Sequence, residues 1–207
     1  MPGGLGDDHA MPLTRPRIRI ALFAALMIAG CAVPPPLPPP QQQLQQLQPS
    51  GTVAAGSHIE VAFSPEAGAE ALVLKVINSA QQQLRLAGYT FTSPAVVSAL
   101  VEAYGRNVDV QVLVDDKDNH GRSSLIAMKL IADAGIPVRT ILAYAIHHDK
   151  YIVVDSRTTE TGSFNYSQAA ARSNSENVMV VWDDPAVAAA YLAHWQGRWS
   201  QGIERKD

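Results

Sequence analysis

The sequence predicts an α/β protein, a single domain whose mixed β-sheet is sandwiched between helices. From residue 58 onward, apolar runs of strand length alternate with longer segments whose apolar residues recur at helical spacing. Residues 58–207 have the length of one domain with a sizeable core, and no internal repeat is visible. The formal net charge of −3 gives no indication of nucleic-acid binding through bulk charge.

The first 30 residues have the pattern of a secretory signal peptide. Three arginines precede the apolar segment 20–28, which is shorter than the roughly 20 residues needed to cross a bilayer. The stretch "IAGC" ends at Cys31 and resembles a bacterial lipobox, in which the cysteine is lipidated. We therefore expect residues 1–30 to be a lipoprotein-type signal peptide, whether translation starts at Met1 or at Met11.

Residues 31–57 are rich in proline and then in glutamine, and they carry no charge. Proline favours an extended, semi-rigid spacer, and the glycine and serine near the end loosen it. We expect this segment to tether the domain to a membrane through lipidated Cys31, which places the protein in the periplasm as an anchored lipoprotein of the cell envelope. Docking of a partner on the proline-rich stretch is the alternative. Cys31 is the single cysteine, so no intramolecular disulfide is possible.

The first half of the domain divides into alternating strands and helices. Ser64 and Pro65, like Ser93 and Pro94, have the pattern of a capping hydroxyl followed by a proline in the first helical turn. The nearly continuous apolar run of "VDVQVLVDD" is typical of a strand covered on both faces. The expected elements are strand 59–65, helix 66–81, strand 84–91, helix 95–106 and strand 108–116.

The second half continues this alternation. Gly135 closes a helix, and Asp184 with Pro185 opens the last one, on which Trp195 and Trp199 share a face and are expected to be core residues. Strands "HDKYIVVD" and "TTETGSF" are expected to form a hairpin around residues 156–157. The expected elements are helix 123–135, strand 136–141, strands 148–155 and 158–164, a short helix, strand 177–182 and the terminal helix.

The stretch "HHDKYIVVD", residues 147–155, places an imidazole and an ammonium at the start of an apolar run. Residues two apart on a strand share a face, so His148 and Lys150 should point the same way and Asp155 elsewhere. An imidazole beside a fixed cation suits phosphate chemistry, because the ammonium favours a bound phosphate while the ring acts as nucleophile or acid. The alternative is a structural histidine beside a solvated lysine.

The pattern His148-x-Lys150-x-x-x-x-Asp155, followed by "GSFN" and "SEN", resembles the phospholipase D superfamily. The resemblance is strongest to its small bacterial endonuclease members with a single motif, and it extends over most of residues 58–202. It implies that His148 is the catalytic histidine and that Asp155 supports the motif away from the substrate.

The resemblance also implies roles for three residues downstream of the motif. Asn165 would bind phosphoryl oxygens together with Lys150, and Ser163 would line the same pocket. Glu176 would accept a hydrogen bond from His148 and hold its tautomer, as carboxylates do behind many catalytic imidazoles.

A covalent route to phosphodiester hydrolysis needs one group to attack phosphorus and a second to protonate the leaving oxygen. Larger members of the superfamily carry the motif twice, whereas this chain carries it once. We therefore expect a homodimer in which each chain gives one His148 to a shared active site.

The expected activity is that of a metal-independent phosphodiesterase, namely a nonspecific endonuclease that cleaves DNA or RNA through a phosphohistidine intermediate. A phospholipase D that hydrolyses phospholipid headgroups is the alternative, and a catalytically silent envelope binding protein is a third reading. The resemblance implies no cofactor and no metal. The sequence contains no zinc-type cluster.

Three further residues have open roles. The stretch 115–121 faintly suggests a calcium loop, but His120 occupies a ligand position and Ala127 stands where a glutamate is needed. We expect a loop at the rim of the site instead, with Lys117 or Arg122 near the substrate phosphate. His147 falls outside the motif spacing and is expected to be a neighbour of the site.

Overall fold

The computed structural model describes residues 56–205, so the predicted signal peptide and almost all of the predicted tether lie outside the described residues. Eight strands form one sheet in the order β1-β7-β6-β5-β2-β3-β4-β8. The strands are β1 (His58–Ser64), β2 (Gln83–Gly88), β3 (Asp109–Asp115), β4 (Val138–Ile141), β5 (Tyr151–Val154), β6 (Thr158–Gly162), β7 (Glu176–Trp182) and β8 (Ile203–Glu204). The helices are α2 (Ala69–Ser79), α3 (Pro94–Gly105), η1 (Lys117–Asn119), α4 (Arg122–Asp133), α5 (Gln168–Arg172) and α6 (Pro185–Trp199).

The sheet is mixed, as the sequence predicts. Strands β2, β3 and β4 run parallel to one another, and the remaining pairs are antiparallel. The parallel pairs are joined through α3 and α4, in keeping with the helical crossover that parallel strands require. The carboxyl ends of β2 and β3 therefore lie at the same sheet end as the start of the antiparallel strand β5.

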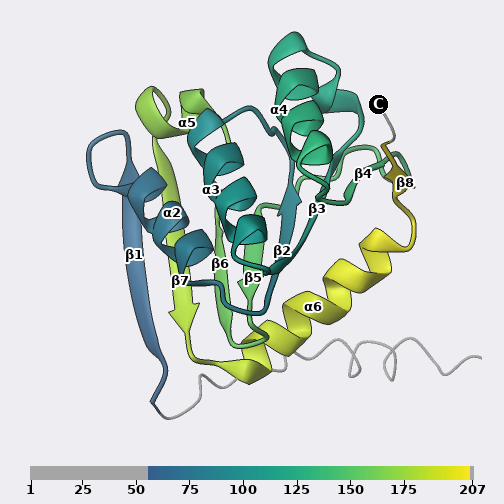
Figure 1. The fold of residues 1–207 in the computed structure, drawn as a ribbon. Coiled ribbons are helices and arrows are strands. Elements are labelled where there is room, and N and C mark those ends of the chain that lie inside the picture. The colour runs from purple at the N-terminus through teal and green to yellow at the C-terminus, as the bar shows by residue number, and fades with distance from the viewer. Residues whose placement is uncertain (1–55, 206–207) are drawn as a thin grey trace, which may run out of the picture. The chain divides into compact units, whose positions relative to one another are not determined.

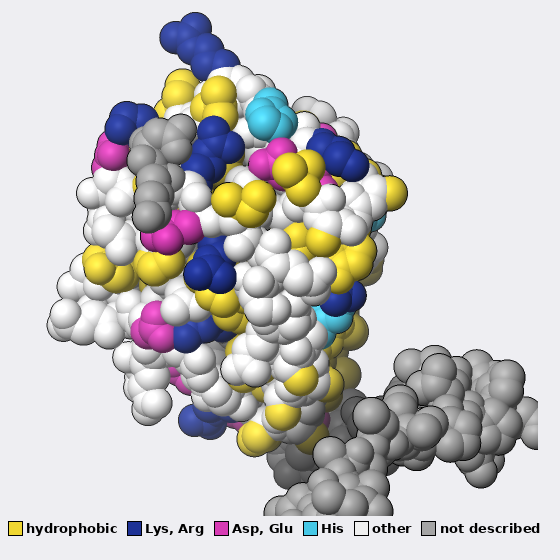
Figure 2. Space-filling view, turned by 90° about the vertical axis from the view of Figure 1, so that its right-hand side faces the viewer, with side chains coloured by type: hydrophobic (Ala, Val, Ile, Leu, Met, Phe, Trp, Pro, Cys, Tyr) yellow, Lys and Arg dark blue, Asp and Glu magenta, His cyan; other side chains and the backbone are white. Residues whose placement is uncertain are grey.

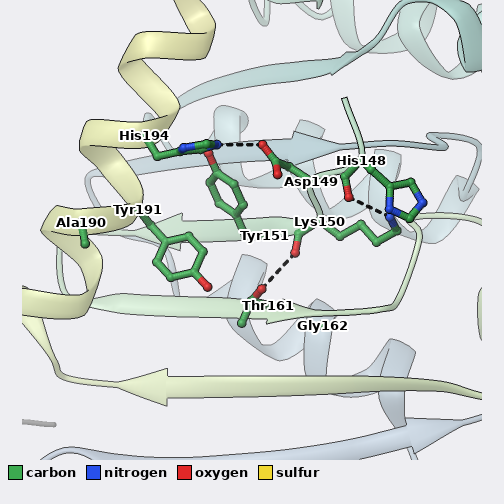
Figure 3. A pocket seen from close by; sticks show the side chains of 9 residues that line it. All are labelled: His148, Asp149, Lys150, Tyr151, Thr161, Gly162, Ala190, Tyr191 and His194. Atoms are coloured by element: carbon green, nitrogen blue, oxygen red, sulfur yellow. Dashed lines mark hydrogen bonds and ion pairs between the residues drawn. The ribbon is translucent and has the colours of Figure 1, made fainter. Parts of the chain in front are cut away.

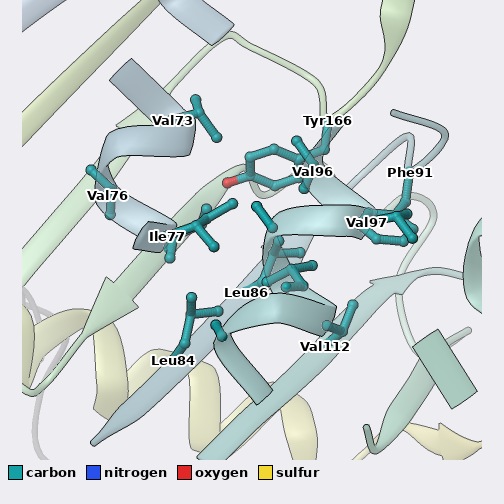
Figure 4. Close-up of a cluster of buried hydrophobic side chains, with 14 of the residues drawn as sticks. Val73, Val76, Ile77, Leu84, Leu86, Phe91, Val96, Val97, Val112 and Tyr166 are labelled. Atoms are coloured by element: carbon teal, nitrogen blue, oxygen red, sulfur yellow. The ribbon is translucent and has the colours of Figure 1, made fainter. Parts of the chain in front are cut away.

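The two faces of the sheet are covered differently (Figure 1). Helices α2, α3 and α4 bury their apolar sides on one face, in a core that includes Val73, Leu86, Val112 and Tyr166 (Figure 4). Helix α6 packs on the opposite face, where Trp195 joins a smaller cluster with Ala87, Tyr151 and Val153. The predicted arrangement of a sheet between helices is confirmed, although α6 covers the second face less completely than α2, α3 and α4 cover the first.

Of the three helix starts predicted from capping residues, two are confirmed and one is wrong. Ser93 accepts a hydrogen bond from the Val96 amide at 3.3 Å, and Asp184 accepts from the amides of Ala186 and Val187. The prediction that Ser64 and Pro65 open a helix is wrong, because β1 runs through Ser64 to keep its pairing with β7. A turn follows, and α2 begins at residue 69. None of the helices in the described region is long and apolar enough to cross a membrane.

The predicted hairpin of β5 and β6 is confirmed, with two shifts. Asp155 and Ser156 both have positive φ, 51° and 55°, so the turn lies one residue earlier than expected. Strand β5 begins at Tyr151, so His148 and Lys150 lie in the irregular segment just before it. Strand β8, which extends the sheet beside β4, is too short to show in the sequence pattern.

Candidate active site

The motif residues come together at one end of the sheet. Tyr151, at the start of β5, pairs with Ala87 near the end of β2 and with Thr161 near the end of β6. In the next pair, Gly162 of β6 lies opposite Val178 near the start of β7. The residues just beyond these strand ends therefore surround one point, which is where the candidate site lies.

Tyr89, the first residue after β2, contacts both histidine and lysine of the motif. Its ring centre lies 4.7 Å from that of His148, with the planes tilted by 60°, and 5.2 Å from Lys150 Nζ. Lys150 Nζ also donates to the backbone carbonyl of His148 at 3.0 Å. The structure thus brings His148 and Lys150 to the same place, as expected, but through a tyrosine that the sequence analysis missed.

Lys150 is almost fully enclosed, with 7% of its surface exposed. Burial lowers the pKa of its ammonium below the usual range, against the attraction of nearby carboxylates, of which Glu176 acts most strongly. A buried cation without a carboxylate in direct contact favours an anionic ligand. Lys150 therefore suits a phosphoryl group.

Ser163 and Glu176 form a hydrogen-bonded pair beside the motif. Ser163 Oγ donates to Glu176 Oε2 at 2.6 Å, and Asn174 Nδ2 donates to Glu176 Oε1 at 2.9 Å. Among the described residues of one chain, the Glu176 carboxylate accepts its hydrogen bonds from Ser163 and Asn174, and the expected one from His148 is absent. A Cβ on Gly162 would lie 2.2 Å from the backbone oxygen of Asn177, so glycine is required where these strands end.

Asn165 lies in the segment just beyond β6, between two core residues. Phe164 and Tyr166 are fully buried in the main core, so the residue between them points the other way. Asn165 Oδ1 is buried and has no hydrogen-bond partner among the described residues. An amide fixed in this way has hydrogen-bonding capacity left for a ligand.

Asp155 follows β5 at the end away from His148 and Lys150, and it contacts the backbone rather than the candidate site. Its carboxylate accepts hydrogen bonds from the backbone amides of Gln81, Gln82 and Gln83, at distances of 2.8 to 3.3 Å. It therefore ties the hairpin turn to the start of β2. This agrees with the expectation that Asp155 points away from His148 and Lys150.

A cavity of about 440 Å³ opens beside the motif (Figure 3). His148 and Lys150 lie at one end, and α6 forms the opposite wall. Its lining residues are His148, Asp149, Lys150, Tyr151, Thr161, Gly162, Ala190, Tyr191 and His194. Only His148 and Lys150 were predicted as site residues, and the other seven, among them Asp149, Tyr191 and His194, were not.

The structure gives the surroundings of Lys117, Arg122 and His147, whose roles the sequence left open. Lys117 Nζ donates to the backbone oxygens of Tyr144 and Ala145, so this ammonium holds the segment that leads to the motif. Arg122 is the first residue of α4 and is exposed. His147 is 3% exposed, and its burial lowers the pKa of the imidazole. The expectation that Trp195 is a core residue is confirmed by its 2% exposure.

Comparison with known proteins places the chain in a family. Residues 73–199 match the family model described as "Cardiolipin synthase, PLD-like domain". A phospholipase D of Rickettsia conorii is 30% identical over 142 residues, which cover 69% of this chain and 70% of the relative. The chain belongs to the phospholipase D family.

Solved structures agree with this assignment. Nuc of Salmonella typhimurium, described as a phospholipase D family member, is 46% identical and has a TM-score of 0.72, covering 73% of this chain and 99% of that one. NucT of Helicobacter pylori, at 21% identity and a TM-score of 0.65, shares the fold. A mitochondrial cardiolipin hydrolase of Xenopus laevis is 31% identical over 144 residues, 70% of this chain and 64% of that protein. The chain is a phosphodiester hydrolase of the phospholipase D family.

Proposed function

We propose that this phosphodiesterase is a nonspecific endonuclease that cleaves DNA or RNA through a phosphohistidine intermediate. The observation that carries the proposal is the gathering of His148 and Lys150 around Tyr89, at the mouth of an open cavity. Attack on a phosphodiester requires a cation that binds the phosphate and a nucleophile beside it, and the buried ammonium and the imidazole fit these two roles.

The proposed reaction has two displacement steps. An imidazole nitrogen of His148 attacks phosphorus, the bond from phosphorus to the leaving oxygen breaks, and a second, protonated imidazole gives its proton to that oxygen. Water then attacks the phosphohistidine, gives a proton to the second imidazole, and releases the phosphate monoester with His148 restored. Lys150 and Asn165 bind the non-bridging oxygens, and Ser163 lines the same pocket beside Glu176.

We propose that the second imidazole is His148 of the partner subunit in a homodimer. The support is an apolar half-face of the sheet that α6 does not cover. Ile59, Val61, Phe63 and Met179 are exposed by 50, 62, 54 and 37%, and Ala62 and Val178, which alternate with them, belong to the main core. A contiguous exposed apolar surface of this kind favours association, and a two-fold interface brings identical sites together.

The dimer also accounts for Glu176. Because no hydrogen bond joins its carboxylate to His148 among the described residues of one chain, we propose that the orienting hydrogen bond to an imidazole forms on assembly. Asp155 needs no such change, since its three amide partners are already in place.

Recognition of the nucleic acid would depend on the site rather than on a large basic surface. On the face shown in Figure 2, Lys and Arg side chains are spread among acidic and apolar ones. Contacts close to the scissile phosphate, without base-edge readout, are consistent with cleavage that ignores sequence.

A phospholipase D acting on phospholipid headgroups is the second candidate. It is favoured by relatives named phospholipase D and mitochondrial cardiolipin hydrolase. It is also favoured by the proposed lipid anchor at Cys31, which would hold the domain at a membrane of the cell envelope. Labelling with radioactive palmitate, lost on Cys31→Ala, tests the anchor.

One assay separates the two candidates. The dimer is given supercoiled plasmid and phosphatidylcholine vesicles side by side, both in EDTA, with His148→Ala as the matched control. We expect the plasmid to be nicked and the vesicles to remain intact, with all cleavage lost in the variant. Release of choline without nicking would make the protein a phospholipase D, and activity restored only by added metal would refute the proposed mechanism.

A further inference from the structure

The cavity continues well beyond the motif. His148 and Lys150 occupy one end, and the remaining wall consists of side chains from β5, β6 and α6 to which no role has been assigned (Figure 3). Its volume of about 440 Å³ lies within the usual range for a small organic ligand, roughly 300 to 1,000 Å³. Because His148 and Lys150 line the same cavity, a phosphodiester bound there has one of its two ester groups within reach of this wall in a pose that points it toward α6.

Asp149 and His194 form a fixed polar pair in the wall. Asp149 Oδ2 lies 2.9 Å from His194 Nε2 and 3.4 Å from Nδ1 of the buried His147. The carboxylate is therefore held in place through Oδ2 by two imidazoles. His194 itself has 39% of its side chain exposed, so its ring is open to a ligand.

Tyr191 supplies an aromatic surface whose position is fixed by packing. Its ring makes an edge contact with the buried Tyr151, with centroids 4.9 Å apart and planes at 69°. Tyr191 is only partly buried, and Thr161 adds a hydroxyl on the same side. The wall thus combines the partly buried ring of Tyr191 with short polar groups, and the described lining contains no leucine, isoleucine, valine or methionine.

We propose that this cavity is a subsite for the nucleoside esterified to the scissile phosphate, with its base against Tyr191 and its sugar beside His194. The inference rests on the proposed nuclease function and deepens it. An aromatic ring with hydroxyl and imidazole neighbours suits a base and a ribose, whereas an acyl chain would find few apolar partners. Stacking does not depend on the base identity, which fits a nonspecific enzyme.

The subsite takes the nucleoside that stays on phosphorus. In the shared site the leaving oxygen must face the imidazole of the partner subunit, whereas the cavity is built entirely from residues of the same chain as the attacking His148. The ester group held in the cavity is therefore the one retained in the phosphohistidine.

Three diesters with the same leaving group test the subsite: thymidine 5′-(4-nitrophenyl phosphate), methyl 4-nitrophenyl phosphate and 4-nitrophenyl phosphocholine. Tyr191→Leu keeps an apolar side chain but loses the ring, and we expect it to lower kcat/KM on the thymidine ester about tenfold. His194→Ala should act in the same direction. Hydrolysis of the methyl ester should stay within about twofold of wild type.

Two matched variants complete the test. Tyr191→Phe keeps the ring and should retain the wild-type preference for the thymidine ester, while Tyr104→Leu, on the exposed side of α3, should change nothing. Circular dichroism and thermal unfolding identify any variant that fails to fold, and if Tyr191→Leu does so, the effect of His194→Ala on the thymidine ester relative to the methyl ester decides the outcome.

Equal losses on the thymidine and methyl esters, no loss on either, or a phenylalanine variant as impaired as leucine would overturn the subsite. A loss confined to the phosphocholine ester would replace it with a headgroup pocket. Failure of the proposed function is separate from these results, because wild-type protein would then leave supercoiled plasmid intact, or His148→Ala would hydrolyse the esters equally well.

Discussion

The two ends of β5 carry residues of one sequence motif but are built in opposite ways. At the first end, His148 and Lys150 meet on the ring of Tyr89 and open into a cavity. At the other end, Asp155 is closed off by hydrogen bonds from three consecutive backbone amides. The first end has polar groups available for a ligand, whereas the second has its carboxylate satisfied by the protein.

Within nine residues of sequence, the first end of the motif therefore serves the chemistry and the second end serves the stability of the fold. An enclosed ammonium beside an accessible cavity costs stability and favours a bound phosphate. A carboxylate that accepts three amide hydrogen bonds stabilises the turn from which β5 and β6 extend. Variants at the two ends should therefore affect different measurements.

The largest effect is expected at the open end. His148→Ala removes the nucleophile, so we expect kcat on a small diester to fall by at least about a thousandfold. The free energy of unfolding should change by less than about 1 kcal/mol, because His148 is exposed and belongs to neither apolar cluster. Steady-state kinetics and urea unfolding on the same samples measure both, and a variant that unfolds instead would place His148 among the structural residues.

The closed end should respond in the reverse manner. Asp155→Ala leaves the three backbone amides of Gln81, Gln82 and Gln83 without their acceptor, so we expect the free energy of unfolding to fall by about 2 to 3 kcal/mol. Activity per folded molecule should stay within about twofold. Asp155→Asn tolerates the positive φ and keeps one acceptor oxygen, so it should lose less. Loss of kcat without loss of stability would contradict the division between the two ends.

Glu160, on β6 between the two ends, extends the comparison to pH. It is fully buried, and burial raises the pKa of its carboxyl to about 8 against the hydrogen bond from Tyr166. The pKa of Glu160 in the folded protein is therefore higher than its pKa of about 4.3 in the unfolded chain. The stability that this difference contributes is complete below the unfolded pKa and is lost as the pH rises toward 8.

We expect the free energy of unfolding of the wild type to fall by up to about 1.4 kcal/mol per pH unit between pH 5 and pH 8. Glu160→Gln should remove this slope, because an amide does not ionise. Urea unfolding at four pH values checks it. Parallel slopes in the two proteins would show that another group causes the pH dependence.

The smallest effect is expected from Glu176→Gln. The amide fills the same space but holds the imidazole in a poorer electrostatic setting, so kcat should fall about tenfold with unchanged stability. Kinetics beside thermal unfolding tests this. An unchanged rate would remove Glu176 from the active site and leave it as a partner of Ser163 alone.

The sequence predicts those features that depend on neighbouring residues. Ser93 and Asp184 cap their helices as expected, and the spacing of His148 and Lys150 indicates their meeting although the strand starts three residues later than expected. The prediction that Ser64 caps a helix is wrong because Ser64 pairs with β7 as the last residue of β1. That pairing depends on a distant segment, so no local pattern reveals it.

Tyr89 and His194 could not be found in this way. Tyr89 is one aromatic residue after a strand, and it reaches the motif only because β2 pairs with β5. His194 is 45 residues from Asp149, and the packing of α6 on the sheet brings the two together. Contacts of this kind depend on the tertiary arrangement, and no spacing rule encodes them.

The central claim is that each active site needs His148 from two chains, and mixing tests it most directly. Wild-type and His148→Ala chains are unfolded together in equal amounts, refolded and assayed. If the site is shared, heterodimers lack one of two required imidazoles, and about a quarter of the wild-type activity remains, from wild-type homodimers formed by random pairing. About half of the activity, or an active monomer in sedimentation, would contradict the shared site.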